Sequence, residues 1–152
     1  MEINESSLIE NELTIRDLRI TKEVLDTRRS VVRWLALALG IISPGESRLT
    51  AISVFDAMLH FQFSERKDPS VEEISDYINR LWAPINEKTL RYHLLQLKKT
   101  NILNNSKGKY FLVAPAIGDR YDPDLWIGNY IDSQVNPIKD KLKVAIKELK
   151  SR

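Results

Sequence analysis

Apolar residues recur three or four positions apart along most of the chain, the spacing that gathers them on one face of an α-helix. The first stripe starts near Asp17 and comprises Leu18, Leu25, Val32, Leu35 and Leu39. Thr21 or Thr27 could cap a break within this stretch, because a threonine hydroxyl accepts the backbone N–H bonds of a helix start. Gly40 and the turn Ser43-Pro44-Gly45 predict where the helix ends.

Two further helices are predicted before residue 83. The first should run from Arg48 to Phe63 with Ser47 as its N-cap, and its apolar face is formed by Leu49, Ile52, Phe55, Leu59 and Phe63. The second should start after Ser70, because Ser70 and Glu73 have the capping-box spacing. It should end near Trp82, with an inward face of Val71, Ile74, Ile78 and Leu81.

A third helix and a hairpin follow. Asn86 is predicted to cap a helix over residues 87–100, whose inner stripe is Leu90, Leu94 and Leu97. Asn101 stands where helices often end in a left-handed residue. Residues 102–103 and 110–113 are predicted as strands, and residues 104–109 as the turn between them.

The chain should end in helical segments. Asp122-Pro123 predicts a helix that begins near Asp124, because proline is favoured in the first turn. Pro137 is expected to interrupt this helix, and a last helix should run from Ile138 to Leu149. The predicted fold class is therefore mostly α with a small β-hairpin.

Composition narrows the chemistry. The 152 residues include no cysteine and two histidines, His60 and His93, so a disulfide framework, a thiolate zinc site and a histidine-based triad are disfavoured. Gly-rich phosphate loops, nucleophile elbows and zinc-binding helix motifs are absent from the sequence. We therefore expect a protein that is not an enzyme and has no metal or cofactor.

The cellular setting is read from two segments. Residues 1–12 lack the basic and apolar regions of a signal peptide. The most apolar run, residues 31–42, contains Arg33 and is shorter than the ~20 residues that cross a bilayer. A cytoplasmic protein without a membrane partner is the expectation.

Charge is unevenly distributed although the chain carries only +2 overall. Residues 84–118 hold six basic side chains and one acidic side chain, whereas residues 46–83 hold four basic and seven acidic ones. A local basic face steers a polyanion to one surface even when the total charge is small. Charge alone leaves a simple solvated helix face as an equal alternative.

The order of three helices and a hairpin, together with one motif, carries a resemblance. Residues 84–103 place Asn86, Thr89, Leu90, Arg91-Tyr92, Leu94, Leu97, Asn101 and Ile102-Leu103 in the order of a recognition helix and first wing strand. The stretch resembles the ArsR/MarR-like winged helix-turn-helix superfamily of transcriptional regulators, from about residue 49 to residue 113. Two departures are Asn101, where that family usually has glycine, and a longer link over residues 79–84.

The resemblance implies a DNA-binding transcriptional regulator with recognition helix 87–100 in the major groove and wing 104–110 on the backbone. The residues expected to contact DNA are Asn86, Glu87, Lys88, Thr89, Arg91, Tyr92, Gln96, Lys107 and Lys109. Arg91 suits guanine, Gln96 suits adenine, and Lys88 suits a phosphate or guanine. Lys107 and Lys109 at the wing suit the backbone or the minor groove. Simpler roles stay open for some of them: a cap for Asn86, a helix-dipole contact for Glu87, backbone bonding for Thr89 and packing for Tyr92.

Three regions are predicted: an N-terminal helical extension (1–45), the winged-helix domain (46–116) and a C-terminal helical extension (117–152) with possible dimerisation. The apolar residues of the extensions must be covered by the core or by a second chain, and a homodimer on double-stranded DNA is the expected assembly. Both extensions could instead wrap one monomer. A winged-helix protein–protein interaction module within a transcription or chromosome-associated assembly is the competing function. The sequence identifies no small-molecule effector.

Overall fold

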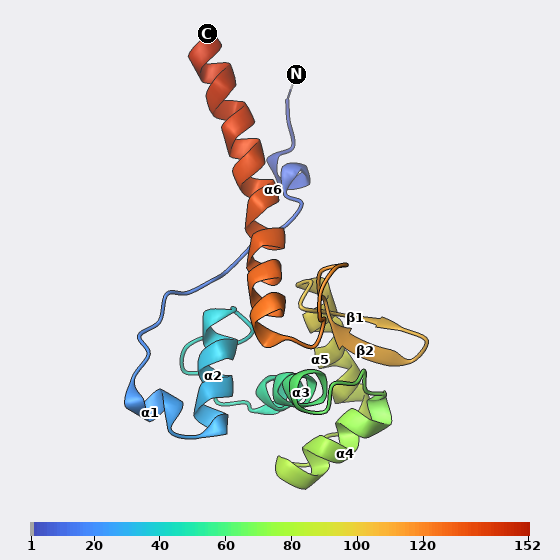
Figure 1. Ribbon diagram of the computed structural model, residues 1–152. Coiled ribbons are helices and arrows are strands. Elements are labelled where there is room, and N and C mark those ends of the chain that lie inside the picture. Colours follow the sequence, from blue (N-terminus) through green and yellow to red (C-terminus); the bar gives the residue numbers. More distant parts are fainter. Residues whose placement is uncertain (1) are drawn as a thin grey trace. The chain divides into compact units, whose positions relative to one another are not determined.

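The computed structural model describes residues 2–152 and divides into two compact units, the first ending at Ser47 and the second spanning Arg48–Arg152. Figure 1 shows a mostly helical chain with a single hairpin among the described residues, which confirms the coarse fold class. None of the helices in residues 2–152 has the length and apolar character needed to cross a membrane.

The first unit contains the 3-10 turn η1 (Glu5–Leu8) and the helices α1 (Lys22–Leu25) and α2 (Arg28–Ala38). Both predicted threonine caps are confirmed. The Thr21 hydroxyl accepts the Val24 N–H at 3.2 Å, and Thr27 forms a capping box with Ser30. The break between α1 and α2 therefore follows from local side-chain bonds to the backbone.

The predicted helix start near Asp17 is wrong, because residues 17–20 are not helical. Arg16, just before this segment, and Arg19 within it form hydrogen bonds to α2 and to the turn that follows it. The backbone N–H of Arg16 donates to the carbonyl of Ala38 at 2.8 Å, and its guanidinium donates to the carbonyls of Leu37 and Ile42. The indole of Trp34 donates to the Arg19 carbonyl at 2.9 Å. These bonds satisfy the last carbonyls of α2 and hold the preceding segment outside a helix.

The second unit begins with α3 (Thr50–Leu59), which continues as the π-helical turn η2 (His60–Ser64). The predicted cap at Ser47 is wrong, since α3 starts three residues later with Leu49 in the cap position. Leu49 is 47% exposed and does not belong to the apolar face assigned to it from the sequence. The chain is still in a turn before this point, where the Glu46 N–H donates to the Ser43 carbonyl.

Helix α4 (Val71–Leu81) starts at the predicted capping box of Ser70 and Glu73, which is confirmed. Ile74 and Ile78 are fully buried as predicted, but Leu81 is 53% exposed. The helix ends at Leu81, and Trp82 turns into an extended conformation. The Trp82 indole donates to the buried carboxylate of Asp56 at 2.9 Å, so Trp82 takes the inward place predicted for Leu81.

Helix α5 (Glu87–Lys99) leads through Asn101, whose φ of 65° confirms the predicted left-handed residue, into a hairpin of β1 (Leu103–Ser106) and β2 (Lys109–Leu112). The register pairs Leu103 with Leu112 and Ser106 with Lys109. The predicted turn over residues 104–109 is too long. Lys107 and Gly108 have φ values of 52° and 76°, which match a two-residue primed turn, and that turn lets the strands pair up to its edge.

One core holds these elements together, with side chains from α3, α4, α5 and the hairpin that are almost fully buried: Ile52, Phe55, Met58, Ile74, Ile78, Leu90, Leu94, Ile102, Leu103 and Leu112. The buried amide of Gln62 links three segments. Its nitrogen donates to the Lys67 carbonyl at 2.7 Å and to Asp68, and its oxygen accepts the Leu112 N–H at 2.8 Å. This amide fixes β2 against the end of α3.

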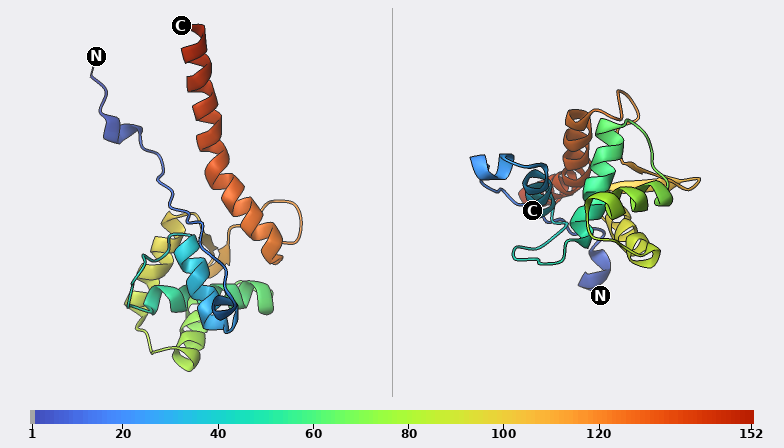
Figure 2. Two further views of the ribbon diagram at one scale, coloured as in Figure 1. Left: turned by 90° about the vertical axis from the view of Figure 1, so that its left-hand side faces the viewer. Right: turned by 90° about the horizontal axis from the view of Figure 1, so that it is seen from below.

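Helix α6 (Pro123–Ser151) begins at the Asp122 cap with Pro123 in its first turn, one residue earlier than predicted. The interruption predicted at Pro137 is wrong, because α6 is continuous through it. Pro137 is exposed, so water can solvate the carbonyl that loses its N–H partner. Trp126, Tyr130 and Gln134 are buried against the unit, whereas residues 136–152 are exposed and extend away from it (Figure 2).

Candidate nucleic-acid interface

The position of α5 is set by its two ends. The Asn86 side chain accepts the Thr89 N–H at 2.8 Å, which confirms the predicted cap. At the other end the Tyr130 hydroxyl of α6 donates to the Thr100 carbonyl at 3.2 Å. Leu90, Leu94 and Leu97 are buried, as predicted. A helix held at both ends and along one side presents the opposite side in a fixed orientation.

The side of α5 opposite the leucine stripe carries Lys88, Tyr92, Leu95 and Lys99, which the 3.6-residue period places together. All four side chains are exposed, Tyr92 to 57% and Leu95 to 48%. We call these four residues the outward face. Leu95 and Lys99 were not among the residues predicted from the sequence. Helical spacing would have found them in the sequence. Tyr92 lies opposite the leucine stripe, and Leu95 and Lys99 follow it by three and seven residues, which keeps them on the same face.

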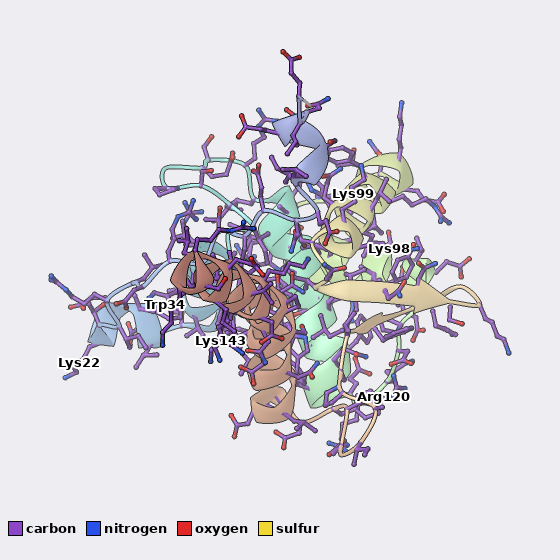
Figure 3. The ribbon with its side chains drawn as sticks, turned by 90° about the horizontal axis from the view of Figure 1, so that it is seen from above. Lys22, Trp34, Lys98, Lys99, Arg120 and Lys143 are labelled. Carbon is purple, nitrogen blue, oxygen red and sulfur yellow. The ribbon has the colours of Figure 1, made fainter. Side chains whose placement is uncertain are left out.

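One flank of α5 lies beside the hairpin and holds a charged pair. Lys98 on this flank donates a 2.9 Å hydrogen bond to the Asn105 side chain of β1. Figure 3 shows Lys98 and Lys99 at the end of α5. Arg91 forms an ion pair with Glu87 at 2.9 Å, and both side chains are more than half exposed. The hydrogen bond and negative charge of Glu87 raise the pKa of Arg91. An exposed pair of this kind contributes little stability, so its guanidinium can exchange the carboxylate for another anion.

The other flank is less accessible. Thr89, His93 and Gln96 are partly buried there. Burial lowers the pKa of His93 and so favours the neutral form of its ring. The ring packs edge to face against Tyr92 at 5.2 Å between centroids. This contact limits the rotation of Tyr92 on the outward face.

The hairpin contributes two lysines in different settings. Lys107 is exposed at the turn. Lys109 lies 3.8 Å from Glu73, whose carboxylate also pairs with Lys67 and accepts the Ser70 N–H. These partners, Lys67 first, lower the pKa of Glu73. Lys109 is therefore partly neutralised at the start of α4, and Lys107 presents the more accessible charge.

The structure thus brings most of the predicted residues to one helix and one hairpin. We call the cationic part of this region the basic surface: Lys88, Arg91, Lys98, Lys99, Lys107 and Lys109. The bond from Lys98 to Asn105 places the Arg91 flank beside the hairpin. Within residues 2–152, no group of three or more histidine, aspartate or glutamate side chains is arranged to hold a metal ion.

Searches of protein-family models, curated proteins and solved structures find no match to this chain.

Proposed function

We propose that the second unit is a winged helix-turn-helix domain of a DNA-binding transcriptional regulator, with α5 as the recognition helix and the hairpin as the wing. The element order α3, α4, α5, β1, β2 supports this proposal, as does the exposure of α5 along its whole outward face. A helix of 13 residues fits the major groove of B-DNA.

The observation that carries the proposal is the outward face itself. Lys88 and Lys99 lie at its two ends, about 16 Å apart along the helix axis, so they suit phosphates on opposite sides of the groove. Tyr92 and Leu95 between them suit the apolar edge of a thymine methyl group. Lys107 at the hairpin turn suits the phosphate backbone beside the groove.

Arg91 must leave its ion pair with Glu87 before it can contact a base. Its guanidinium is engaged by Glu87 in the free protein, so binding to guanine needs the carboxylate to be displaced. A bidentate guanine contact offers two charge-assisted hydrogen bonds in return, and the exposed ion pair costs little to open. Glu87 therefore acts against indiscriminate binding, because DNA without a guanine at the right position does not repay its displacement.

Duplex binding across a salt series tests the proposal. Between about 50 and 200 mM salt, log K should fall linearly with log salt, and loss of one phosphate contact should reduce the slope by about 1. Lys88→Ala and Lys99→Ala should each show that reduction on a random-sequence duplex. Lys22→Ala, in the other unit, is the matched control and should keep the native slope. Failure of the native protein to bind at the lowest salt contradicts the proposal.

A protein-interaction module is the second candidate, favoured by the exposed Tyr92 and Leu95 at the centre of the outward face. Aromatic and aliphatic anchors ringed by charge are typical of interface centres. The two functions separate in one experiment. If the partner is DNA, Leu95→Ala should change binding to a random-sequence duplex by little and leave the salt slope unaltered, whereas a protein partner should lose much of its affinity.

A further inference from the structure

The exposed part of α6 carries an apolar stripe that the rest of the second unit leaves uncovered. Val135, Ile138, Leu142 and Ile146 line a groove along the helix, and Leu149 follows one turn later. Leu142 is 62% exposed and Leu149 is 72% exposed. Four large aliphatic side chains in a row on an exposed helix mark an interaction surface.

The spacing of the stripe indicates what covers it. Residues 135, 138, 142, 145 and 149 alternate steps of three and four, which is the a/d pattern of a coiled-coil seam, with valine, isoleucine, leucine, alanine and leucine in turn. The lysines at 139 and 141 and the glutamate at 148 then occupy the e and g positions that border the seam. A seam of this kind fits another helix with the same spacing.

We propose that α6 pairs with α6 of a second copy of this chain as a short antiparallel coiled coil centred between Lys143 and Val144. Antiparallel packing places each a position opposite a d position. Leu142 then meets Ala145 of the second copy, and Ile138 meets Leu149, so a large residue fills the space beside each alanine. A parallel pair would stack Ala145 on Ala145 and leave a gap in the seam.

Charge selects this orientation and this register. In the proposed pair Lys141 lies beside Glu148 of the second copy, and the two-fold axis repeats the contact. A parallel pair places Lys141 beside Ile146 instead. A second antiparallel register is shifted by one heptad toward the start of α6. It places Lys141 of one copy against Lys141 of the other, and Lys139 against Lys139, and both contacts are repulsive. The proposed register has two opposite-charge contacts and avoids both repulsions.

The proposal differs from the homodimer expected from the sequence, because it assigns the interface to one helix face and makes no use of DNA. The pairing stands even if the basic surface binds protein or nothing. Its test is therefore carried out on the full chain without DNA.

Sedimentation across a concentration series measures the pairing. Leu142→Asp should weaken dimer formation at least tenfold, because it buries a carboxylate in the seam. Val144→Asp is the matched control: Val144 is 64% exposed, lies two residues away and faces the opposite side of the helix. It should keep the native mass. A native chain that sediments as a monomer at every concentration overturns the proposal, and so does equal behaviour of the two variants.

Single cysteines test the orientation, since the chain has none of its own. Ile138→Cys mixed with Leu149→Cys should form a mixed disulfide far faster than either variant forms a disulfide with itself. The antiparallel pair brings 138 and 149 together, but it separates each from its own copy by about 16 Å along the axis. Rapid self-cross-linking of both variants shows a parallel pair and overturns the register.

Discussion

The indole Nε1 of Trp82 donates a 2.9 Å hydrogen bond to Oδ2 of Asp56, and this bond ties the end of α4 to the middle of α3. The Tyr77 hydroxyl donates to the same oxygen at 2.7 Å. The chain runs from Trp82 directly into the link that ends at the Asn86 cap. A buried carboxylate on α3 thus sets where the link to α5 begins.

Removing this carboxylate should destabilise the second unit. Asp56 is 3% exposed, so Asp56→Ala leaves two donors without their acceptor in the interior. We expect a loss of about 3 kcal/mol in the free energy of unfolding, measured by urea denaturation. Asp76→Ala, an exposed aspartate on α4, is the control and should change stability by less than about 0.5 kcal/mol. Equal effects of the two variants contradict this role for Asp56.

The Asn86 cap should be separable from any contact with DNA. Asn86→Ala removes the acceptor for the Thr89 N–H and should cost about 1 kcal/mol of stability. Asn86→Ser keeps a capping oxygen and should restore the stability. If duplex affinity also returns with serine, Asn86 acts as a cap alone. A serine variant that is stable but binds weakly instead identifies a direct contact by the amide.

Replacing Lys107 should raise the stability of the hairpin and weaken duplex binding. Lys107 has a left-handed backbone conformation that β-carbon-bearing residues adopt at a cost, whereas asparagine before glycine is favoured in this turn. Lys107→Asn should therefore raise the free energy of unfolding by about 0.5 kcal/mol and reduce the salt slope of duplex binding by about 1. Thermal unfolding and fluorescence anisotropy measure the two effects. A variant that loses stability would show that the lysine packs on the hairpin.

Glu87→Gln should strengthen duplex binding. The change releases Arg91 from its ion pair and removes the single carboxylate of α5. We expect tighter binding to random-sequence duplexes at low salt, because Arg91 becomes free to contact phosphate. The gain on a preferred sequence should be at least as large, because that sequence no longer has to displace Glu87. Unchanged affinity for both duplexes would mean that Arg91 does not reach DNA.

Acid should destabilise the contact between α4 and the hairpin. The Lys67 ammonium, the Ser70 N–H and Lys109 lower the pKa of Glu73 below its ordinary value of 4.5. A carboxyl whose pKa is lower in the folded state than in the unfolded state stabilises the fold at any pH above its unfolded-state pKa. This stabilisation is lost as the pH falls through the folded-state pKa. Glu73→Gln should remove this part of the pH dependence of stability, which lies below about pH 5. Midpoints of urea unfolding at a series of pH values measure it. Glu72→Gln, its exposed neighbour, should keep the native profile.

Local signals were sufficient to predict most of the second unit. The caps at Ser70 and Asn86 and the leucine stripe of α5 depend on residues three or four apart, so the sequence shows them directly. The hairpin was located but its turn was overestimated, because a lysine is an unusual residue at a left-handed turn position.

The errors have long-range causes. The Arg16 contacts to Leu37 and Ile42 span more than twenty residues, and no local pattern indicates that they keep residues 17–20 out of a helix. The Trp82 bond to Asp56 likewise decides that Leu81 turns outward. On α5 the stripe was read correctly, but residues were chosen for their hydrogen-bonding chemistry. That choice omitted the exposed Leu95 and Lys99.

The amide of Gln62 has a consequence for the order in which the domain forms. The hairpin closes a loop of two residues and can fold on its own within microseconds, whereas the bond from Leu112 to Gln62 joins positions fifty residues apart. We therefore expect the hairpin to pair early and to dock on Gln62 later. Its two lysines would then reach their final position relative to α5 only on docking, so a variant with weakened docking should keep its helices and hairpin and lose the arrangement of the proposed basic surface.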